Sequence, residues 1–310
     1  METNKDFNTL LCLSQMNIAI LLTVYNRKEK TLRCLNSLVD SHAKAGSKIR
    51  YKVFLTDDGC TDGTREAIEK AGYGFAMCIL QGDGNLYWNG GMIKSWKAAI
   101  ADDEHYDGYL WLNDDAVVLP DFWKDLAVAD DASMGKYGRK GIYVGSTYNT
   151  NGEFTYGGFD FVNPWTLKDR FVLPDSHTFQ PCQCAHGNIT YVSHQVVEEM
   201  GIFSDEYIHG ASDHDYTYRA YKHKFPVLVM PHYAGICEND HAEDGYVDFF
   251  NMPLRKRLAY LKSPFGFNLH NTLLFQKRCF PYRYPFVWVV GYIKALFPKQ
   301  YFGFYRWIRR

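Results

Sequence analysis

The sequence lacks the signatures of several common protein classes. Its eight cysteines include no Cys-x-x-Cys pair, which argues against a structural zinc site. It contains neither G-x-G-x-x-G nor G-x-x-x-x-G-K-[ST], and this disfavours dinucleotide-binding and P-loop proteins. The best apolar run, 286–297, is twelve residues long, contains Lys294 and stops at Pro298, so it is too short for a transmembrane helix.

The N-terminal stretch lacks the continuous apolar core of a secretory signal. It carries Lys5 and Asp6, and its apolar residues are interrupted by Ser14, Gln15 and Asn17. We therefore expect a cytoplasmic protein whose thiols stay reduced.

Negative charge is missing from one segment, residues 251–310, which contains twelve Lys or Arg, sixteen aromatics and no Asp or Glu. Residues 1–250 then hold 22 Lys or Arg against 35 Asp or Glu, a net charge of −13. A basic, aromatic segment suggests peripheral contact with an anionic membrane, which would place the protein at the inner face of the membrane. The alternative is a set of packed C-terminal helices with solvated cations. Since no nucleic-acid-binding module accompanies the segment, no nucleic acid partner is expected.

Residues 17–115 alternate between strand and helix patterns. The apolar run 17–24 predicts a strand buried on both faces, and 28–40 has helical spacing. Further strands are predicted at 51–56, 76–81 and 109–112, and further helices at 64–71 and 92–101. This alternation predicts an open, doubly wound α/β sheet.

The second half of the chain is expected to be more irregular and more antiparallel. From 141 to 192, short β-like runs alternate with Gly and Pro turns, followed by a helix at 194–200 and a strand at 226–230. Only the change in charge suggests a boundary near residue 250.

Polar clusters follow three of the predicted strands, at 23–27, 57–64 and 113–115. Ligands of open α/β sheets bind outside the carboxyl ends of the strands, so we expect the site there. Adjacent carboxylates such as Asp114 and Asp115 repel each other, and a divalent metal bridging them to a diphosphate would offset the repulsion. A solvated turn before Pro120 is the alternative.

The 56–64 segment contains more carboxylates than a helix cap requires. Asp62 or Thr61 can cap the helix that follows. Asp57 and Asp58 are not needed for capping, and one of them could accept the imide N–H of uracil or thymine.

A glycine- and asparagine-rich turn at 82–91 would let the backbone pass close to a ligand before a helix whose N-terminus favours phosphate. A plain loop is the alternative. The candidate donor-contacting residues of this turn are Asn85, Trp88, Asn89 and Gly90.

The 210–219 segment offers a candidate general base. If a helix begins here, Asp215 and Arg219 stand at i and i+4 and pair with each other, leaving Asp213 as the freer carboxylate. An N-cap plus a structural ion pair is the alternative. His232 and His241 flank the next strand and either could reach a metal, with the denser cluster at 237–241 favouring His241.

Four segments, in this order along the chain, resemble motifs of the family 2 glycosyltransferases of the GT-A fold, in particular their rhamnosyltransferase-like branch. Thr23-Val24-Tyr25-Asn26-Arg27 resembles the opening T-x-Y-N, Asp57-Asp58-Gly59-Cys60-Thr61-Asp62 the D-D-G-S-T-D turn, Asn113-Asp114-Asp115 the DxD-type metal motif, and Ser212-Asp213-His214-Asp215 with Arg219 the E-D-x-D-x-x-x-R motif. The resemblance spans roughly residues 17–241.

The resemblance implies a GT-A catalytic domain at 1–250, with a mixed, doubly wound sheet and a basic aromatic helical extension at 251–310. Its nucleotide-sugar-binding half would be 17–115 and its more irregular acceptor and catalytic half 116–250.

The resemblance also implies roles for individual residues. Asp213 would be the catalytic base, and Asp115, with His241, would bind Mg²⁺ or Mn²⁺. Thr23, Tyr25 and Asp58 would contact the nucleobase and ribose, and Asp114 would lie near the ribose or metal. The remaining donor-contacting candidates are Asn26, Arg27, Asp57, Asn85, Trp88, Asn89, Gly90 and Asn113. Two departures stand out: Ser212 replaces the usual Glu, and Cys237 occupies the position, counted from Asp213, of a metal-directed His.

The implied activity is inverting transfer of a sugar, with rhamnose as one candidate, from a UDP- or dTDP-linked donor. The acceptor would be a saccharide or lipid-linked saccharide in polysaccharide or glycoconjugate synthesis. One alternative is a sugar-phosphate nucleotidyltransferase, although only Arg27 and Lys28 would serve its triphosphate loop. Another is a non-catalytic carbohydrate- or membrane-binding relative, which the Ser212 departure favours.

Overall fold

The computed structural model describes residues 16–239, 249 and 251–308, so the metal ligand predicted at His241 lies outside the described residues. The first half contains β1 (Asn17–Val24), α1 (Lys28–Ala45), β2 (Arg50–Asp57), α2 (Thr64–Ala71), β3 (Ala76–Gln81), α3 (Tyr87–Ile100) and β4 (Gly108–Leu112). The second half contains β5 (Val117–Val118), α4 (Pro120–Tyr137), β6 (Ile142–Tyr148), β7 (Gly158–Asn163), β8 (Lys168–Phe171), β9 (Gln180–Pro181), β10 (Cys184–Ala185), β11 (Ile189–Ser193), α5 (His194–Met200), α6 (Ser212–Lys222) and β12 (Val227–Ile236).

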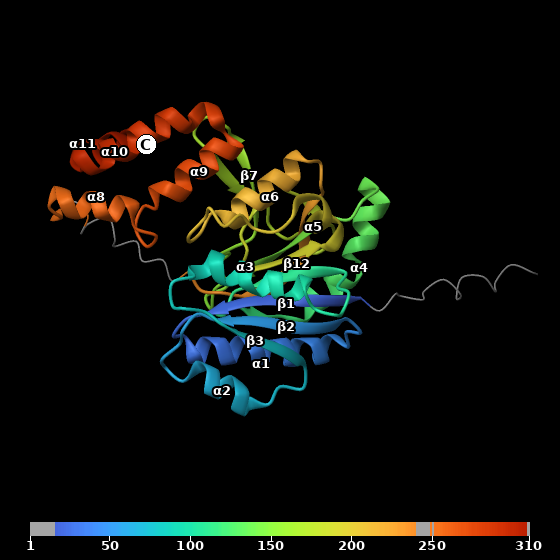
Figure 1. Cartoon of the computed structure of the whole chain (residues 1–310). Coiled ribbons are helices and arrows are strands. Elements are labelled where there is room, and N and C mark those ends of the chain that lie inside the picture. Colours follow the sequence, from blue (N-terminus) through green and yellow to red (C-terminus); the bar gives the residue numbers. More distant parts are fainter. Residues whose placement is uncertain (1–15, 240–248, 250, 309–310) are drawn as a thin grey trace, which may run out of the picture.

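A large mixed sheet forms the centre of the molecule, with strand order β3-β2-β1-β4-β11-β6-β12-β5 (Figure 1). The strands β3, β2, β1 and β4 are parallel, whereas β11 is antiparallel to both β4 and β6. The chain moves from β1 outward to β3 and then returns to place β4 on the other side of β1. Strand order therefore reverses between β1 and β4, which is where ligands bind in doubly wound sheets.

Both faces of this sheet are covered, as the uninterrupted apolar run of β1 requires. Ile18, Ile20 and Leu22 pack with α1 and α4 on one face. Ala19 and Leu21 pack with α3 and α6 on the other face, in a core rich in aromatic side chains. The period of two along β1 thus divides its side chains between two hydrophobic cores.

The second half is irregular and largely antiparallel, as predicted, and includes a separate three-stranded sheet of order β10-β7-β8. The predicted helix at 194–200 is confirmed as α5, and the strand predicted at 226–230 is β12, which continues to Ile236. Its added length matters because it brings residue 237 to the carboxyl edge of the sheet, beside β5.

The C-terminal segment is helical, as expected. It forms α8 (Leu254–Lys262), α9 (Leu269–Cys279), the 3₁₀ turn η1 (Pro281–Arg283), α10 (Tyr284–Leu296) and α11 (Pro298–Ile308). Figure 1 shows these helices grouped at the upper left, with α9 beside α6. The Asn271 amide donates to the carbonyls of His209 (2.7 Å) and Gly210 (3.0 Å), which fixes α9 to the loop before α6. Within the described ranges, none of the helices is long and apolar enough to cross a membrane.

Candidate active site

The carboxyl ends of β1 and β4 are joined by Arg27. Its guanidinium donates to Asp114 Oδ1 at 3.0 Å and to Asp115 Oδ2 at 2.6 Å, so one cation holds both carboxylates. Burial raises the pKa of the Asp114 carboxyl to about 7, although the nearby Arg27 cation acts to lower it. Repulsion within the acidic pair was predicted to need a compensating charge, and in the structure Arg27 supplies it.

Asp115 also faces the end of β12. Its Oδ1 lies 3.6 Å from the Cys237 sulfur, which in turn is 3.5 Å from the amide nitrogen of Asn188. Burial, and next the Asp115 charge, raise the pKa of the Cys237 thiol to about 12, so it stays protonated at neutral pH. Cys237 was not among the predicted ligands, yet counting from Asp213 had placed it at the position of a metal-directed histidine.

A divalent metal fits Asp115 only if a bound ligand completes its coordination. Among the described residues, no three His, Cys, Asp or Glu side chains group as a metal site. Mg²⁺ is commonly held by one or two carboxylates together with substrate phosphates, and an oxygen of Asp115 suits that arrangement. His232 is engaged elsewhere, since its Nδ1 lies 3.0 Å from Asp125 Oδ1 on α4.

The Asp58 carboxylate, whose contact with the nucleobase stays a prediction, makes hydrogen bonds inside the protein. Its two oxygens accept the backbone N–H groups of Gly84 (2.9 Å), Leu86 (3.0 Å) and Tyr87 (3.2 Å), and the residue is almost fully buried. Three N–H bonds to one carboxylate hold the 84–87 loop against the end of β2. Asp58 is therefore a positioning residue for that loop.

Asn26 and the 57–62 turn are also held together by internal hydrogen bonds. The Asn26 side-chain oxygen accepts from the Thr61 N–H at 2.7 Å, and Asp57 Oδ1 accepts from the Cys60 N–H at 2.8 Å. Asp62 accepts from the N–H of Thr64, the first residue of α2, at 3.1 Å, but the N-cap residue of α2 is Gly63, so the predicted cap by the Asp62 or Thr61 side chain is wrong. These bonds leave the neighbouring Tyr25 ring 53% exposed at the end of β1.

The helix α3 begins at Tyr87, five residues before the predicted start, so the glycine-rich loop is shorter than expected. Asn89 is completely buried and its amide donates to the carbonyls of Ser204 (2.9 Å) and Tyr207 (2.7 Å), so it holds that loop; its contact with the donor stays a prediction. A side chain at Gly91 would lie 2.0 Å from Thr23 Oγ1, so this glycine allows α3 to pack on β1.

Two of the loop candidates remain accessible to a ligand, and one glycine lies at the start of the helix. Asn85 is exposed on the 82–86 loop. Trp88 donates from Nε1 to the Asn113 side-chain oxygen at 2.8 Å, which connects α3 to the end of β4. Gly90 lies in the first turn of α3, where its N–H donates to the carbonyl of Leu86 at 3.0 Å.

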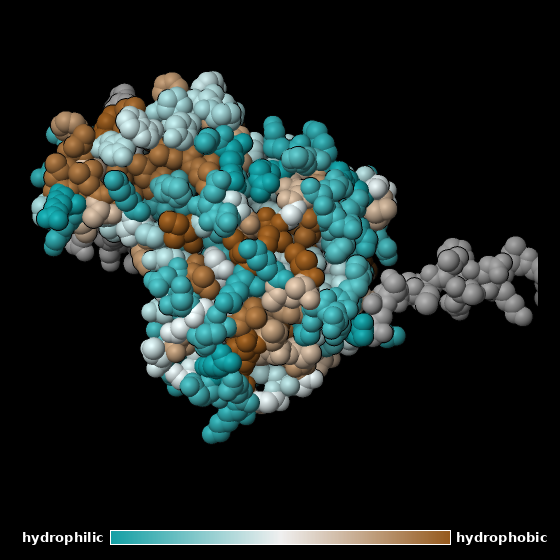
Figure 2. Space-filling model, viewed as in Figure 1, coloured by the Kyte–Doolittle hydropathy of each residue, from teal (hydrophilic) through white to brown (hydrophobic). Residues whose placement is uncertain are grey.

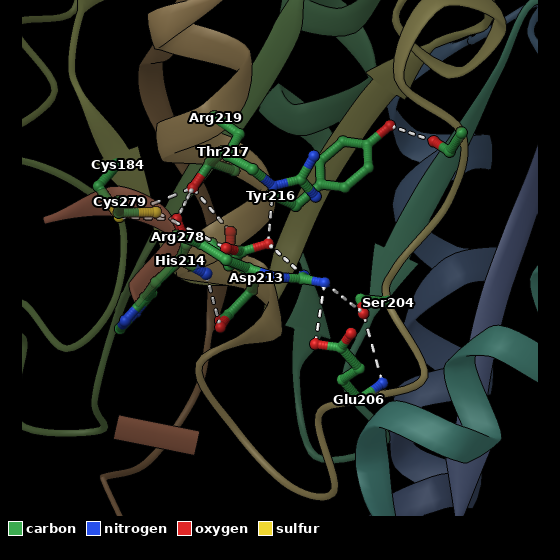
Figure 3. A network of polar contacts seen from close by, with 12 residues as sticks. Cys184, Ser204, Glu206, Asp213, His214, Tyr216, Thr217, Arg219, Arg278 and Cys279 are labelled. Carbon is green, nitrogen blue, oxygen red and sulfur yellow. Dashed lines mark hydrogen bonds and ion pairs between the residues drawn. The ribbon is translucent and has the colours of Figure 1, made fainter. Parts of the chain in front are cut away.

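Asp213 and Asp215 differ in environment, as predicted. Asp215 is buried and accepts from Arg219 Nε at 2.8 Å, which confirms the i, i+4 pair, and it also lies 3.4 Å from Arg278 Nη1. Figure 3 shows Arg278, which belongs to α9, reaching the base of α6, with dashed lines to Ser204 and Glu206. This arginine was not found from the sequence because it follows Asp215 by 63 residues.

Within the part of the chain that the structure describes, the Asp213 carboxylate is held by backbone groups and not by a cation. Its Oδ2 accepts from the Gly187 N–H at 2.9 Å, and its Oδ1 accepts from the His214 N–H at 2.9 Å. The residue is half-buried at the N-terminus of α6. Beside it, Ser212 is buried and its hydroxyl is unpaired within the described part of the protein.

Gly187 lies between the start of α3 and the start of α6. A side chain there would lie 3.1 Å from the Trp88 ring and 3.2 Å from the Asp213 Cβ, so both flank the same backbone position. The next residue, Asn188, accepts the Asn113 N–H at 2.9 Å and contacts Cys237, the neighbour of Asp115. The ends of β4 and β12 and the starts of β11, α3 and α6 therefore lie together here. Asp115 follows the end of β4, and Asp213 lies at the start of α6.

The sequence matches one family model, and several solved structures have a similar fold. The model described as glycosyl transferase family 2 matches residues 19–200. The mannosyltransferase PcManGT from Pyrobaculum calidifontis, in complex with GDP-Man and Mn²⁺, superposes with a TM-score of 0.52 at 12% identity, covering 90% of this chain and 75% of that chain.

TarS 1–349 from S. aureus superposes with a TM-score of 0.51 at 17% identity, covering 90% of this chain and 81% of that chain. The same fragment in complex with UDP gives 0.51 at 15% identity over 79% and 69%. No curated protein matches the sequence. At these identities the solved structures show a common fold.

Proposed function

The chain belongs to glycosyl transferase family 2, and from that premise we propose that it transfers a sugar from a nucleoside diphosphate sugar to an acceptor hydroxyl, with inversion at the anomeric carbon. The observation that carries the proposal is the contrast at α6. Asp215 is neutralised by two arginines, whereas Asp213, two residues away, is held among the described residues only by backbone N–H groups.

We assign the donor to the edge formed by β1, β2 and the 82–86 loop. The Tyr25 ring is exposed there and offers a flat surface for a nucleobase. The TarS fragment was solved with UDP and the mannosyltransferase with GDP-Man, so proteins of this fold bind nucleotides with different bases. A UDP- or dTDP-linked donor, with rhamnose as a candidate sugar, remains our proposal from the sequence motifs.

Arg27 and Asp115 would receive the diphosphate. The Arg27 guanidinium lies at the switch point between β1 and β4 and can donate to phosphate oxygens in the fork geometry that suits them. A divalent ion, Mg²⁺ or Mn²⁺, held by Asp115 would neutralise charge on the diphosphate as it leaves. His241 stays a predicted second ligand.

Asp213 would act as the base. Its two backbone hydrogen bonds fix the carboxylate at the junction with Gly187 and Trp88. It would take the proton of the acceptor hydroxyl while that oxygen bonds to the anomeric carbon and the bond to the diphosphate oxygen breaks on the opposite face. One displacement of this kind inverts the configuration. The acceptor would be a saccharide or a lipid-linked saccharide.

The decisive experiment is Asp213→Asn, which keeps the shape of the side chain and one oxygen that can accept a backbone N–H, but removes the base. Transfer should fall by about 10²–10⁴-fold, the usual contribution of a general base, while nucleotide binding measured by calorimetry stays unchanged. Asp205→Asn, on the exposed loop before α6, is the matched control and should keep full transfer. Turnover that survives Asp213→Asn would remove this residue from its role.

A further inference from the structure

The helix α10 turns apolar side chains away from the protein. Phe286 is 67% exposed and Phe297, directly after the helix, is 55% exposed. Between them Val289, Val290 and Ile293 are exposed as well. At 100° per residue these five positions share one side of the helix, which we call the α10 outer face. The opposite side carries Gly291 and Ala295, which are buried.

This orientation differs from that of an ordinary helix on a globular domain, where the apolar side covers a core. A side chain at Gly291 would lie 2.6 Å from Leu269, so α10 packs closely on α9 through its small residues. The large apolar residues are left outside. Figure 2 shows the brown surface gathered over these C-terminal helices, at the upper left of the view. Contiguous apolar patches of this kind mark interaction surfaces.

The segment that carries the outer face is rich in cations and contains no acidic residue. This 251–310 segment has twelve Lys or Arg. On α8, which packs against α10, Arg255 and Lys256 are exposed, and Lys299 is exposed at the start of α11. The segment therefore combines exposed apolar side chains with positive charge, the combination that binds the headgroup region of anionic lipid.

We propose that the α10 outer face docks on an anionic bilayer surface, with α10 lying in the plane of the headgroups. With thirteen residues, α10 is long enough to lie in this layer and too short to span it. A two-fold contact with a second copy of the chain would bring two sets of uncompensated cations together, so charge favours lipid as the occupant.

The C-terminal segment also contacts the donor edge. The exposed Phe265 ring, between α8 and α9, lies 5.5 Å from the Tyr87 ring at the start of α3 and 5.4 Å from the His209 ring. The segment thus reaches the loop that Asp58 positions. If the proposed function holds, the segment that docks on lipid is the same one that touches the donor edge; the docking itself does not depend on that function.

The test is flotation of the full chain with vesicles of phosphatidylcholine alone or mixed with phosphatidylglycerol. The wild-type chain should float with the mixed vesicles and not with phosphatidylcholine, and salt should release it. The double variant Phe286→Ser, Ile293→Ser should lose about tenfold in vesicle affinity. Because both residues are exposed, its melting temperature should match that of the wild type.

The matched control is Val128→Ser, Met134→Ser, which removes two exposed apolar residues from α4 and should float like the wild type. Equal flotation with both vesicle types, or equal loss in the control, would overturn the proposal. So would a wild-type chain that ignores vesicles but forms dimers that the α10 variant abolishes, since the face would then be a contact between copies. None of these readouts requires sugar transfer, so failure here is separate from failure of the proposed function.

Discussion

Two acidic pairs lie at the proposed site, and they are neutralised in different ways. At the end of β4, Arg27 is shared between Asp114 and Asp115. On α6, Arg219 and Arg278 both pair with Asp215, whereas the groups that Asp213 accepts from, among the described residues, are backbone N–H groups. The β4 pair is thus arranged for a ligand that brings its own charges, whereas the α6 pair keeps one carboxylate structural and the other available for proton transfer.

The largest effect is expected for Asp115→Asn, which tests the role of the acidic pair at the end of β4. The substitution removes the charge that would hold a metal and the diphosphate, so transfer should fall by about 10³-fold. The free energy of unfolding should change by less than about 1 kcal/mol, since Asp115 lies at the ligand side of the pair and its amide can still accept from Arg27. Transfer assays and urea unfolding of the same preparation separate the two effects. Near-normal transfer would show that Asp115 does not serve the donor.

The opposite pattern is expected for Asp215→Asn. This change leaves Arg219 and Arg278 without their buried anion, and it should lower the free energy of unfolding by about 2–3 kcal/mol, less than for a fully buried pair because both arginines are partly exposed. Urea unfolding measures it. Glu206→Gln is the control, since that carboxylate pairs with Arg278 at the surface, and its effect should stay below about 1 kcal/mol. Equal losses in the two variants would contradict the assignment.

A fall in pH should lower the free energy of unfolding through His186, which lies beside α6. Burial, and next the charge of His214, lower the pKa of His186 to about 4. The unfolded chain binds this proton near its usual pKa of about 6.5, so stability is complete above that pH and is lost as the pH falls toward about 4.

Between about pH 7 and pH 5, the His186 contribution to this loss should be about 2 kcal/mol. His186→Gln should flatten the pH dependence of urea unfolding by that amount. The exposed His177→Gln should not. An unchanged slope in the first variant would show that His186 is protonated in the folded chain.

The smallest effect is expected for Arg27→Gln. Asp114 is buried but Arg27 is partly exposed, so unfolding should become easier by only about 1 kcal/mol. Donor binding, measured by calorimetry with UDP and Mn²⁺, should weaken more than stability does if the guanidinium also contacts phosphate. Arg65→Gln, which breaks an exposed pair with Glu69 on α2, should change neither quantity measurably. A loss of stability without a loss of binding would limit Arg27 to a structural role.

The fold was largely predictable because its first half follows from local patterns. The apolar run of β1 and the helical spacing of α1 depend on neighbours in sequence, so β1 was found at its true bounds and α1 at its true start, although α1 continues five residues beyond the predicted end. The start of α3 was missed because its first turn contains Gly90 and Gly91, which are poor helix formers. Gly91 is required by contact with Thr23, a contact between distant residues that no local pattern reports.

For the candidate site, the sequence motifs predicted where residues lie better than they predicted what the side chains contact. The motifs correctly placed Asp213, Asp215 and Arg219 on one helix. They did not show that Asp58 accepts three backbone N–H groups, or that Asn89 is buried against the 204–207 loop, because both depend on how the chain folds back on itself. Arg278 likewise becomes visible only once α9 is packed on α6.

That arginine has a consequence for how the protein can evolve. Because Arg278 supplies part of the counter-charge of Asp215, the helices after residue 250 are tied to the helix that carries Asp213. These C-terminal helices therefore cannot be exchanged between relatives as an independent unit. A graft from another protein would have to bring a cation to the same place, so Asp215 and Arg278 should be inherited or lost together.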